Sequence, residues 1–193
     1  MKLFGLTGGV GMGKSTAAGF LLQLGMRVVD TDDLAHVLVQ PGQPALAEIG
    51  ATFGKNIFNS DGGLNRAELA RIVFSDKAAR KKLEAILHPR IRADWQSQVE
   101  TWRQEKCAGA VVIIPLLYET GAENLFEKII CVACSSASQR ERLRLRGWTP
   151  EQSQQRITAQ MPVEQKIACA NFIIWTEGLP ENSCRQLAKI IVR

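Results

Sequence analysis

Residues 8 to 15 read GGVGMGKS and match the phosphate-binding pattern G-x-x-x-x-G-K-[ST]. The apolar segment KLFGLT (2–7) precedes this stretch, and the helix-forming segment AAGFLLQL, which ends at Gly25, follows it. Glycines let successive backbone N–H groups converge on a phosphate, and the N-terminus of a helix adds about half a positive charge there. The sequence therefore predicts a strand, a phosphate-binding loop (P-loop) and a helix, in that order.

The side chains of this loop have expected roles in binding ATP with Mg²⁺. Lys14 should reach the β and γ phosphates, Ser15 should ligate the Mg²⁺ that bridges them, and the Thr16 hydroxyl should lie nearer the α phosphate. The nucleotide-binding residues expected from the motif are Gly8, Gly11, Met12, Gly13, Lys14, Ser15 and Thr16.

Apolar segments recur along the chain in the strand–helix alternation that is typical of a parallel sheet. Each is short and rich in Val, Ile or Leu, as strands buried on both faces should be. The five predicted strands are 2–7, 26–30, 110–117, 128–133 and 171–175. The expected fold is therefore α/β: a P-loop NTPase three-layer sandwich around a five-stranded parallel sheet.

About eighty residues without a strand signal separate the second and third strands, far more than an ordinary crossover helix requires. They are expected to form an inserted helical lobe. Asn65 followed by Glu68 resembles a capping box, and Ser75 or Asp76 is placed to cap the helix KAARKKLEAIL, which should stop near Pro89.

An apolar stripe follows on one face of a further helix in the same insertion, because Ile91, Trp95, Val99 and Trp102 recur at spacings of four, four and three. We expect these residues in the core. The alternative is that the tryptophans form a wall for adenine or another flat group.

Length and composition predict one compact domain of 193 residues with a substantial core. No segment has the character of a signal peptide or a membrane span, so a cytoplasmic location is expected. The five cysteines fit reduced thiols, and Cys131 and Cys134 in a buried strand should point to opposite faces rather than share a metal. A net charge of +5 suits an anionic partner.

The segment Asp30-Thr31-Asp32-Asp33 at the end of the second strand favours a kinase over other P-loop proteins. The carboxyl ends of parallel strands face the ligand crevice, and a carboxylate there suits a kinase, whose attacking hydroxyl must lose its proton. We assign Asp32 as the general base and Asp33 as the cap of the next helix, although Asp32 is also placed to be that cap. No N-K-x-D guanine motif occurs, and the third strand has no terminal Asp of the kind that motor ATPases carry.

The segment QRERLRLR at 139–146 is expected to form an arginine-bearing lid. Helical spacing puts Arg142 and Arg146 on one face and Arg140 and Arg144 on nearly the opposite one, so only one pair should face the phosphates. Arginines there would stabilise the transition state and exclude water. The alternative is a solvated basic face.

Taken together, these segments resemble the dephospho-coenzyme A kinase family across nearly the whole chain. The resemblance rests on GLTGGVGMGKST (5–16), VVDTDDLAH (28–36), LHP (87–89), IIPLLYE (113–119), QRERLRLR (139–146) and RITAQMP (156–162). The P-loop is generic, but its combination with D-x-D, LHP and PLL-x-E is specific. The resemblance implies transfer of phosphate from ATP to the 3′-hydroxyl of dephospho-coenzyme A.

The resemblance also implies roles for individual residues. Asp32 matches the catalytic aspartate, Gly11 to Thr16 the ATP loop, and Arg142, Arg146 and Arg156 the lid arginines. Residues expected to contact the substrate are Asp30, His88, Leu117 and Glu119. For His88 alone, the sequence indicates a helix-terminal histidine held by local carbonyls.

The implied architecture is a single kinase domain, expected as a monomer. The core comprises 1–33, 108–134 and 165–193, the substrate lobe 34–107 and the lid 135–164. The family usually has an acidic residue where Asn171 stands and a small polar residue near Trp175, so Trp175 is open to stacking on a base or capping the sheet.

Two rival functions remain at this point. A nucleoside monophosphate kinase shares the loop and lid, but the carboxylates of Asp30 and Asp32 would repel its anionic acceptor. A nucleic-acid-binding module would use the positive charge, but acids such as Glu141 and Glu151 interrupt the basic residues, and no nucleic-acid-binding signature occurs. We therefore expect no nucleic acid and no membrane as partner.

Overall fold

The computed structural model describes residues 1–191, except for the side chain of Phe74. The chain divides into two compact units. The first comprises Met1–Asp30 and the chain from Trp102 onward, and the second comprises Thr31–Thr101.

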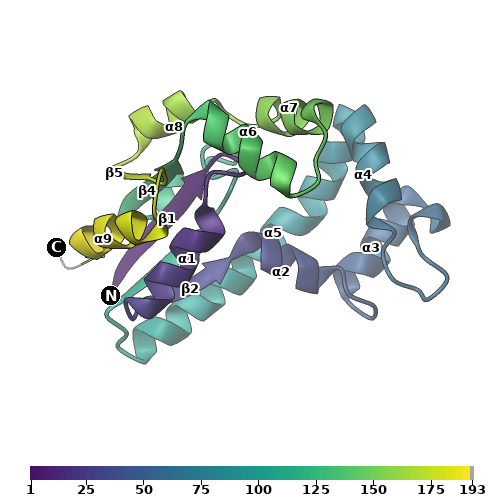
Figure 1. The fold of residues 1–193 in the computed structure, drawn as a ribbon. Helices are drawn as coiled ribbons and strands as arrows, with labels where there is room; N and C mark the ends of the chain where they lie inside the picture. The colour runs from purple at the N-terminus through teal and green to yellow at the C-terminus, as the bar shows by residue number, and fades with distance from the viewer. Residues whose placement is uncertain (192–193) are drawn as a thin grey trace. The chain divides into compact units, whose positions relative to one another are not determined.

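The first unit is built on a five-stranded, all-parallel sheet (Figure 1). Its strand order is β2-β3-β1-β4-β5. The strands are β1 (Lys2–Gly8), β2 (Arg27–Asp30), β3 (Gly109–Ile113), β4 (Lys128–Ala133) and β5 (Phe172–Trp175). β1 lies at the centre and pairs with β3 and β4, so Leu6 stands opposite both Ile113 and Ile130. The predicted α/β fold with five parallel strands is confirmed.

Helices cover the sheet on both faces and make three layers. α1 (Lys14–Gln23) and α9 (Pro180–Ile191) lie beside each other on one face, where Leu21 and Leu187 are fully buried against the strands. α8 (Val163–Cys169) and the chain around Leu117 pack on the other face. The remaining helices of this unit are α6 (Ser136–Leu145), α7 (Pro150–Thr158) and the 3₁₀ turn η2 (Glu123–Leu125).

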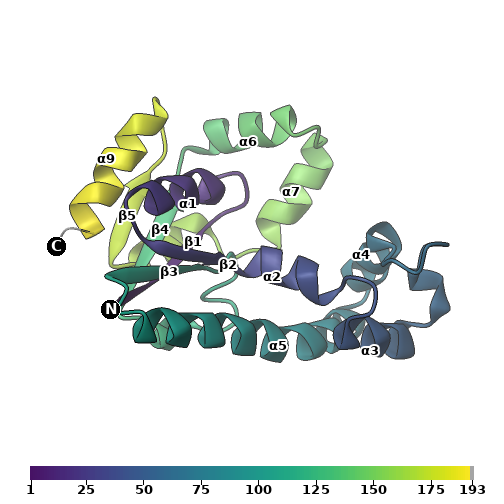
Figure 2. The same ribbon diagram turned by 90° about the horizontal axis from the view of Figure 1, so that it is seen from below.

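The second unit is helical, as the missing strand signal predicted (Figure 2). It contains α2 (Thr31–Leu38), α3 (Pro44–Phe53), the 3₁₀ turn η1 (Lys55–Ile57), α4 (Arg66–Ser75) and most of α5 (Lys77–Gln104). Its apolar core includes Ile49, Ile57 and Ile86. Asp76 accepts the N–H of Ala78 at 2.7 Å, as expected of a cap. The Asn65 side chain accepts the N–H of Glu68 at 3.1 Å, but the capping box is incomplete, because the Glu68 carboxylate bonds to Arg71 and the Asn65 N–H to the Ile57 carbonyl oxygen.

Two expected boundaries are wrong, and both involve proline. β3 ends at Ile113 rather than at Leu117, because Pro115 has no N–H to continue the ladder. α5 continues through Pro89 instead of stopping there. Pro89 is exposed, and burial of Trp95 and Val99 beyond it favours one continuous helix over the roughly 3 kcal/mol that an internal proline costs.

The same continuity places His88 at an exposed position inside a helix, so the helix-terminal interpretation of His88 is wrong. α2 begins at Thr31, which makes Asp33 the third residue of the helix rather than its cap. The stripe of Ile91, Trp95, Val99 and Trp102 lies on α5, with Trp95 and Val99 buried. No helix within residues 1–191 is long and apolar enough to cross a membrane.

Candidate active site

The P-loop joins β1 to α1 in the predicted place. Gly8 approaches the neighbouring strand so closely that a Cβ atom would lie 2.3 Å from the Val132 carbonyl oxygen. Gly13 is the N-cap of α1 and has a φ of 98°, which only glycine adopts readily. Within the described residues, no side chain caps α1 and no acidic residue lies in its first turn. This helix N-terminus therefore has the backbone donors and the charge that favour a phosphate.

The polar side chains at the end of the P-loop are Lys14, Ser15 and Thr16. Lys14 Nζ donates to the carbonyl oxygens of Gly8 at 2.9 Å and Gly9 at 3.1 Å, which keeps the ammonium group over the loop. Ser15 and Thr16 are exposed in the first turn of α1. Met12 is 2% exposed, and its backbone is bonded within the protein: its N–H donates to the Gly9 carbonyl oxygen at 3.2 Å, and its carbonyl oxygen lies 2.9 Å from the Thr176 hydroxyl.

The tip of the P-loop at Val10 is held by two glutamine side chains from later in the chain. Val10 N–H donates to Gln160 Oε1 at 2.9 Å, and Gln139 Nε2 donates to the Val10 carbonyl oxygen at 2.8 Å. Neither glutamine was expected at the site. The string RITAQMP contains Gln160, but nothing in its local pattern indicates a contact 150 residues away.

Thr176, directly after β5, is a third residue that was not expected at the site. Its hydroxyl oxygen lies 2.9 Å from the Met12 carbonyl oxygen and 3.2 Å from that of Ala133. The same oxygen accepts from Arg142 Nη1 at 3.0 Å, and Arg142 Nη2 donates to the Thr176 carbonyl. Thr176 thus joins the sheet, the P-loop and an expected lid arginine. A polar residue at the carboxyl end of a strand was the one available signal.

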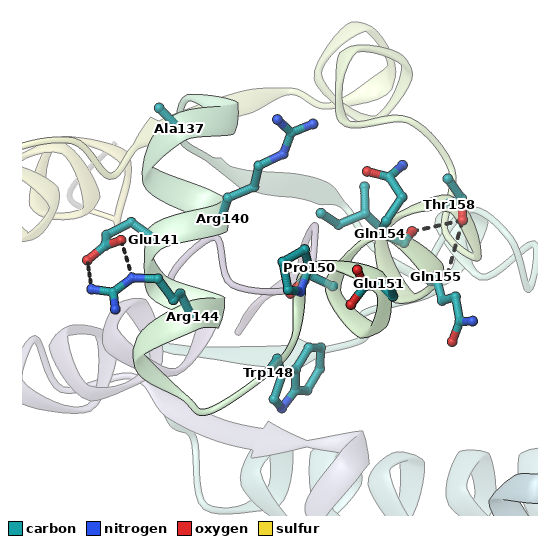
Figure 3. A pocket seen from close by; sticks show the side chains of 12 residues that line it. Ala137, Arg140, Glu141, Arg144, Trp148, Pro150, Glu151, Gln154, Gln155 and Thr158 are labelled. Atoms are coloured by element: carbon teal, nitrogen blue, oxygen red, sulfur yellow. Dashed lines mark hydrogen bonds and ion pairs between the residues drawn. The ribbon is translucent and has the colours of Figure 1, made fainter.

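Arg142 and Arg144 have different surroundings, whereas the expected pairing of Arg142 with Arg146 on one helical face stays a prediction, because α6 ends at Leu145. Arg142 is half-buried beside Thr176, whereas Arg144 is exposed and forms an ion pair with Glu141 at 2.7 Å. Arg140 and Arg144 line a pocket between α6 and α7 (Figure 3). Arg146 follows the last residue of α6 and is exposed.

The expected lid arginine Arg156 lies in α7. Its guanidinium carbon lies 5.6 Å from the ring centre of Trp148, a residue that also lines the pocket between α6 and α7. This distance is within the range of a cation–π contact.

Further contacts fasten α6 to the sheet. Leu143 is fully buried and packs against Gly11 of the P-loop. Glu177 accepts the Ser135 N–H and the Ser138 hydroxyl, both at 2.7 Å. These hydrogen bonds lower the pKa of Glu177 to about 2, so its carboxylate is charged at neutral pH.

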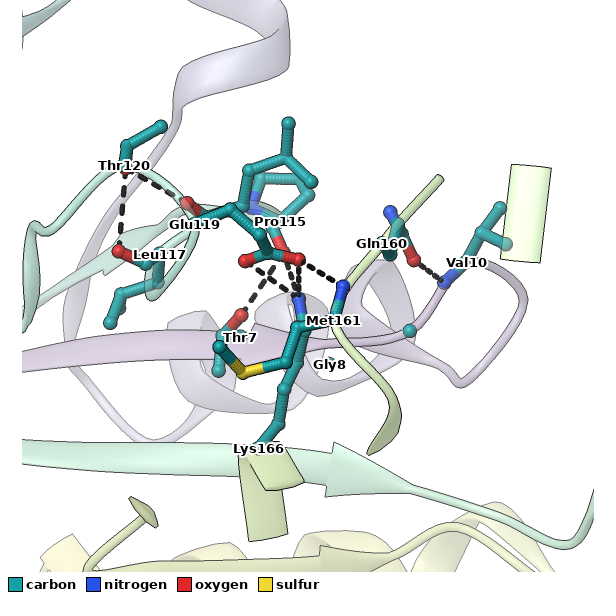
Figure 4. Close-up of polar contacts among 12 residues, drawn as sticks. Thr7, Gly8, Val10, Pro115, Leu117, Glu119, Thr120, Gln160, Met161 and Lys166 are labelled. Carbon is teal, nitrogen blue, oxygen red and sulfur yellow. Dashed lines mark hydrogen bonds and ion pairs between the residues drawn. The ribbon is translucent and has the colours of Figure 1, made fainter. Parts of the chain in front are cut away.

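The segment after β3 carries two of the expected substrate residues in different environments. Leu117 is fully buried in an apolar cluster with Ala122 and Ile129. Glu119 Oε1 lies 2.8 Å from Lys166 Nζ and accepts the Met161 N–H at 2.8 Å (Figure 4). In this structure Leu117 is a core residue, and the Glu119 carboxylate is occupied by contacts within the protein.

The remaining residues that were expected at the site are Asp30, Asp32 and His88. Asp30 is its last residue, half-buried at the carboxyl edge of the sheet. Asp32 lies in the first turn of α2, at the beginning of the second unit, and His88 lies in α5 of that unit. Only Thr31 therefore lies between the end of β2 and Asp32.

The five cysteines are spread over the strands, helices and loops of the first unit. All five are free, and among residues 1–191 no group of three or more His, Cys, Asp or Glu side chains is placed to hold a metal ion. Burial raises the pKa of Cys131 to about 11, so its thiol is protonated at neutral pH.

The two departures from the family pattern also have local partners. The Asn171 side chain accepts the Ile129 N–H at 2.8 Å and so joins β5 to β4. Trp175 is 45% exposed at the end of β5, and its backbone N–H and carbonyl both bond to the Gln186 side chain.

The parallel sheet with a P-loop between β1 and α1 places the protein in the class of P-loop NTPases. Shikimate kinase from Acinetobacter baumannii shares this fold, with a TM-score of 0.53 and 14% identity over 100% of this chain and 91% of that chain.

The sequence also matches the family model CoaE, described as dephospho-CoA kinase, over residues 2–181. The dephospho-CoA kinase of Shouchella clausii is 42% identical over 184 residues, which cover 95% of this chain and 93% of that protein. The structure of dephospho-CoA kinase from Campylobacter jejuni has a TM-score of 0.72 and 30% identity, covering 100% of this chain and 96% of the other. TT1252 from Thermus thermophilus has a TM-score of 0.85 and 30% identity, covering 99% and 96%. The chain belongs to the dephospho-CoA kinase family.

Proposed function

We propose that this protein transfers the γ-phosphate of ATP to the 3′-hydroxyl of dephospho-coenzyme A, giving coenzyme A and ADP, the last step of coenzyme A synthesis. The observation that carries the proposal is the family match over residues 2–181, on a chain whose P-loop ends at an uncapped helix N-terminus. We place the enzyme in the cytoplasm.

The residues of the first unit hold the nucleotide in this mechanism. Backbone N–H groups of the P-loop bind the phosphates, and Lys14 leaves its loop carbonyls to contact the β and γ oxygens. Arg142, held beside the P-loop by Thr176, stabilises the charge that develops on the transferred group, together with Arg146. Arg156 contacts the nucleotide from α7.

Asp32 acts as the general base. It accepts the proton of the 3′-hydroxyl as that oxygen attacks the γ-phosphorus and the bond to the β–γ bridging oxygen breaks. Asp30, His88, Leu117 and Glu119 are proposed to shape the dephospho-coenzyme A site. For Leu117 and Glu119 that role is indirect, since the Leu117 side chain is buried and the Glu119 carboxylate is bonded to Lys166 and to the Met161 N–H.

The residues present fit Mg²⁺. The Ser15 hydroxyl is exposed in the first turn of α1, adjoining the backbone donors of the P-loop, and would be its protein ligand. When bound, Mg²⁺ neutralises charge on the β and γ oxygens.

The test is to mix purified protein with Mg-ATP and dephospho-coenzyme A and to follow ADP release and product mass. AMP, other nucleotides and water alone serve as acceptor controls. We expect ADP release only with dephospho-coenzyme A, and a product one phosphate heavier. Turnover with AMP instead would move the protein to the nucleotide kinases, and ATP binding without transfer would refute a kinase function.

A further inference from the structure

Lys166 of α8 is fully buried, yet the proposed mechanism uses it for no step. Its Nζ atom lies 2.8 Å from Glu119 Oε1 and donates to the Pro115 carbonyl oxygen at 2.7 Å. The Pro115 oxygen also accepts the Thr7 hydroxyl at 3.2 Å, just before the P-loop. A buried ammonium group is tolerated only where such partners compensate its lost hydration. The pair therefore fixes the Glu119 carboxylate in one position.

Glu119 in turn holds the main chain of the segment between α7 and α8. Its carboxylate accepts the Met161 N–H at 2.8 Å, and the preceding residue, Gln160, accepts the Val10 N–H at 2.9 Å (Figure 4). Because Gln160 and Met161 are adjacent, fixing one backbone position limits where the other side chain can reach. A continuous set of contacts thus runs from buried Lys166 to the tip of the P-loop.

The hydrogen bond from the Val10 N–H to Gln160 restrains a flexible part of the P-loop. Val10 lies between Gly9 and Gly11, and glycines lose more backbone freedom on ordering than other residues. A loop that is already ordered loses less freedom when a ligand binds, and so binds more tightly.

We infer that Gln160, Glu119 and Lys166 are positioning residues for ATP: the buried ion pair fixes the backbone at Met161, and Gln160 holds the P-loop at Val10. Gln139 supports the other side of the same residue through the Val10 carbonyl. This inference rests on the proposed function, because it assumes that ATP is the ligand of the P-loop.

The first test replaces Gln160 by Met, which keeps the length of the side chain and removes the acceptor. Gln165→Met is the matched control, because Gln165 is exposed on neighbouring α8. An ordinary hydrogen bond corresponds to roughly a fivefold to tenfold change. We therefore expect Gln160→Met to weaken ATP binding by that factor in a direct titration. The KM for dephospho-coenzyme A should change less than about twofold, and the Tm should match that of Gln165→Met.

Two results would overturn the inference. One is ATP affinity in Gln160→Met equal to that of Gln165→Met. The other is a raised KM for dephospho-coenzyme A with ATP affinity intact, which would make the segment part of the acceptor site.

The second test asks whether the ion pair acts through Gln160. The double variant Glu119→Leu with Lys166→Met removes both charges together and leaves neither buried alone. We expect it to lose ATP affinity about as much as Gln160→Met, and adding Gln160→Met should cost less than about a further twofold. A full additional loss would show that Glu119 and Lys166 act independently of Gln160.

The proposed function and this inference fail in different ways. If the unaltered protein binds ATP but transfers phosphate to no acceptor, the function fails, and the titrations still test the positioning. If the unaltered protein is an active kinase and Gln160→Met binds ATP normally, only the inference fails.

Discussion

Asp32 is the residue on which the proposed chemistry depends most. It lies in the first turn of α2, two residues beyond the last residue of β2. In the proposed mechanism, its carboxylate accepts the proton that the attacking hydroxyl must lose.

Asp32→Asn should keep ATP binding and lose most of kcat. The amide is close in shape but accepts no proton, and a general base contributes about 10²- to 10⁴-fold. The measurements are kcat with saturating substrates and ATP affinity by titration. Near-normal turnover would remove Asp32 from the mechanism.

Arg142 and Arg144 differ in surroundings although they are two residues apart on α6. Arg142→Ala and Arg146→Ala should each reduce turnover more than Arg144→Ala. The pair of Arg144 with Glu141 is exposed, and such surface pairs contribute about 0–1 kcal/mol. Steady-state kinetics of the three variants provide the comparison, and small, equal effects would favour a solvated basic face.

Among the elements, α6 is attached to the chain after β5 and to the P-loop by several contacts, whereas a lid is expected to move. Glu177 holds its N-terminus, Thr176 holds Arg142, and Leu143 is buried against Gly11. We therefore expect any closure over ATP to involve α7, which follows Gly147, more than α6.

The attachment of α6 should depend on pH through Glu177. Its pKa is lowered from 4.5 to about 2, so the charged form is favoured in the folded protein. This contribution to stability is present above about pH 4.5 and is lost as the pH falls towards 2. Glu177→Gln should therefore lower Tm at pH 7, and the difference from the unaltered protein should shrink at pH 2.5. An equal difference at both pH values would contradict this role.

Replacing Pro89 within α5 is expected to stabilise the protein and, at the same time, to weaken its activity. Pro89→Ala restores a helix-compatible residue with an N–H group, and we expect the free energy of unfolding to rise by about 1–3 kcal/mol. Because Pro89 also constrains the turn that carries His88, the KM for dephospho-coenzyme A should rise. Thermal unfolding and kinetics measure the two effects, and a lowered Tm would show that the helix already accommodates the proline.

At the scale of the whole molecule, the net charge of +5 suits anionic polyphosphate ligands. Between 50 and 200 mM salt, a protein held by many phosphate contacts to nucleic acid loses about 10³- to 10⁵-fold in affinity. We expect the KM for ATP to change less than about threefold over this range. A steep loss, together with binding to DNA or RNA at low salt, would favour the nucleic-acid module.

Local pattern was sufficient to predict the P-loop, the five strands and the helical insertion. These features depend on residues within a few positions of one another, so they can be recognised from local spacing and composition. The predictions for β3 and for the helix before Pro89 were wrong at their ends, because tertiary packing decided between extending and stopping.

The support around the P-loop belongs to the tertiary structure alone. Gln139, Gln160 and Thr176 contact loop residues 129 to 164 positions away, and Lys166 meets Glu119 across 47 positions. None of these residues carries a local signal of its partner, because a polar side chain that is buried and bonded in the fold has the same letter as one exposed on a surface. Only the folded sheet, by bringing β1, β4 and β5 side by side, determines which polar residues meet at the phosphate-binding loop.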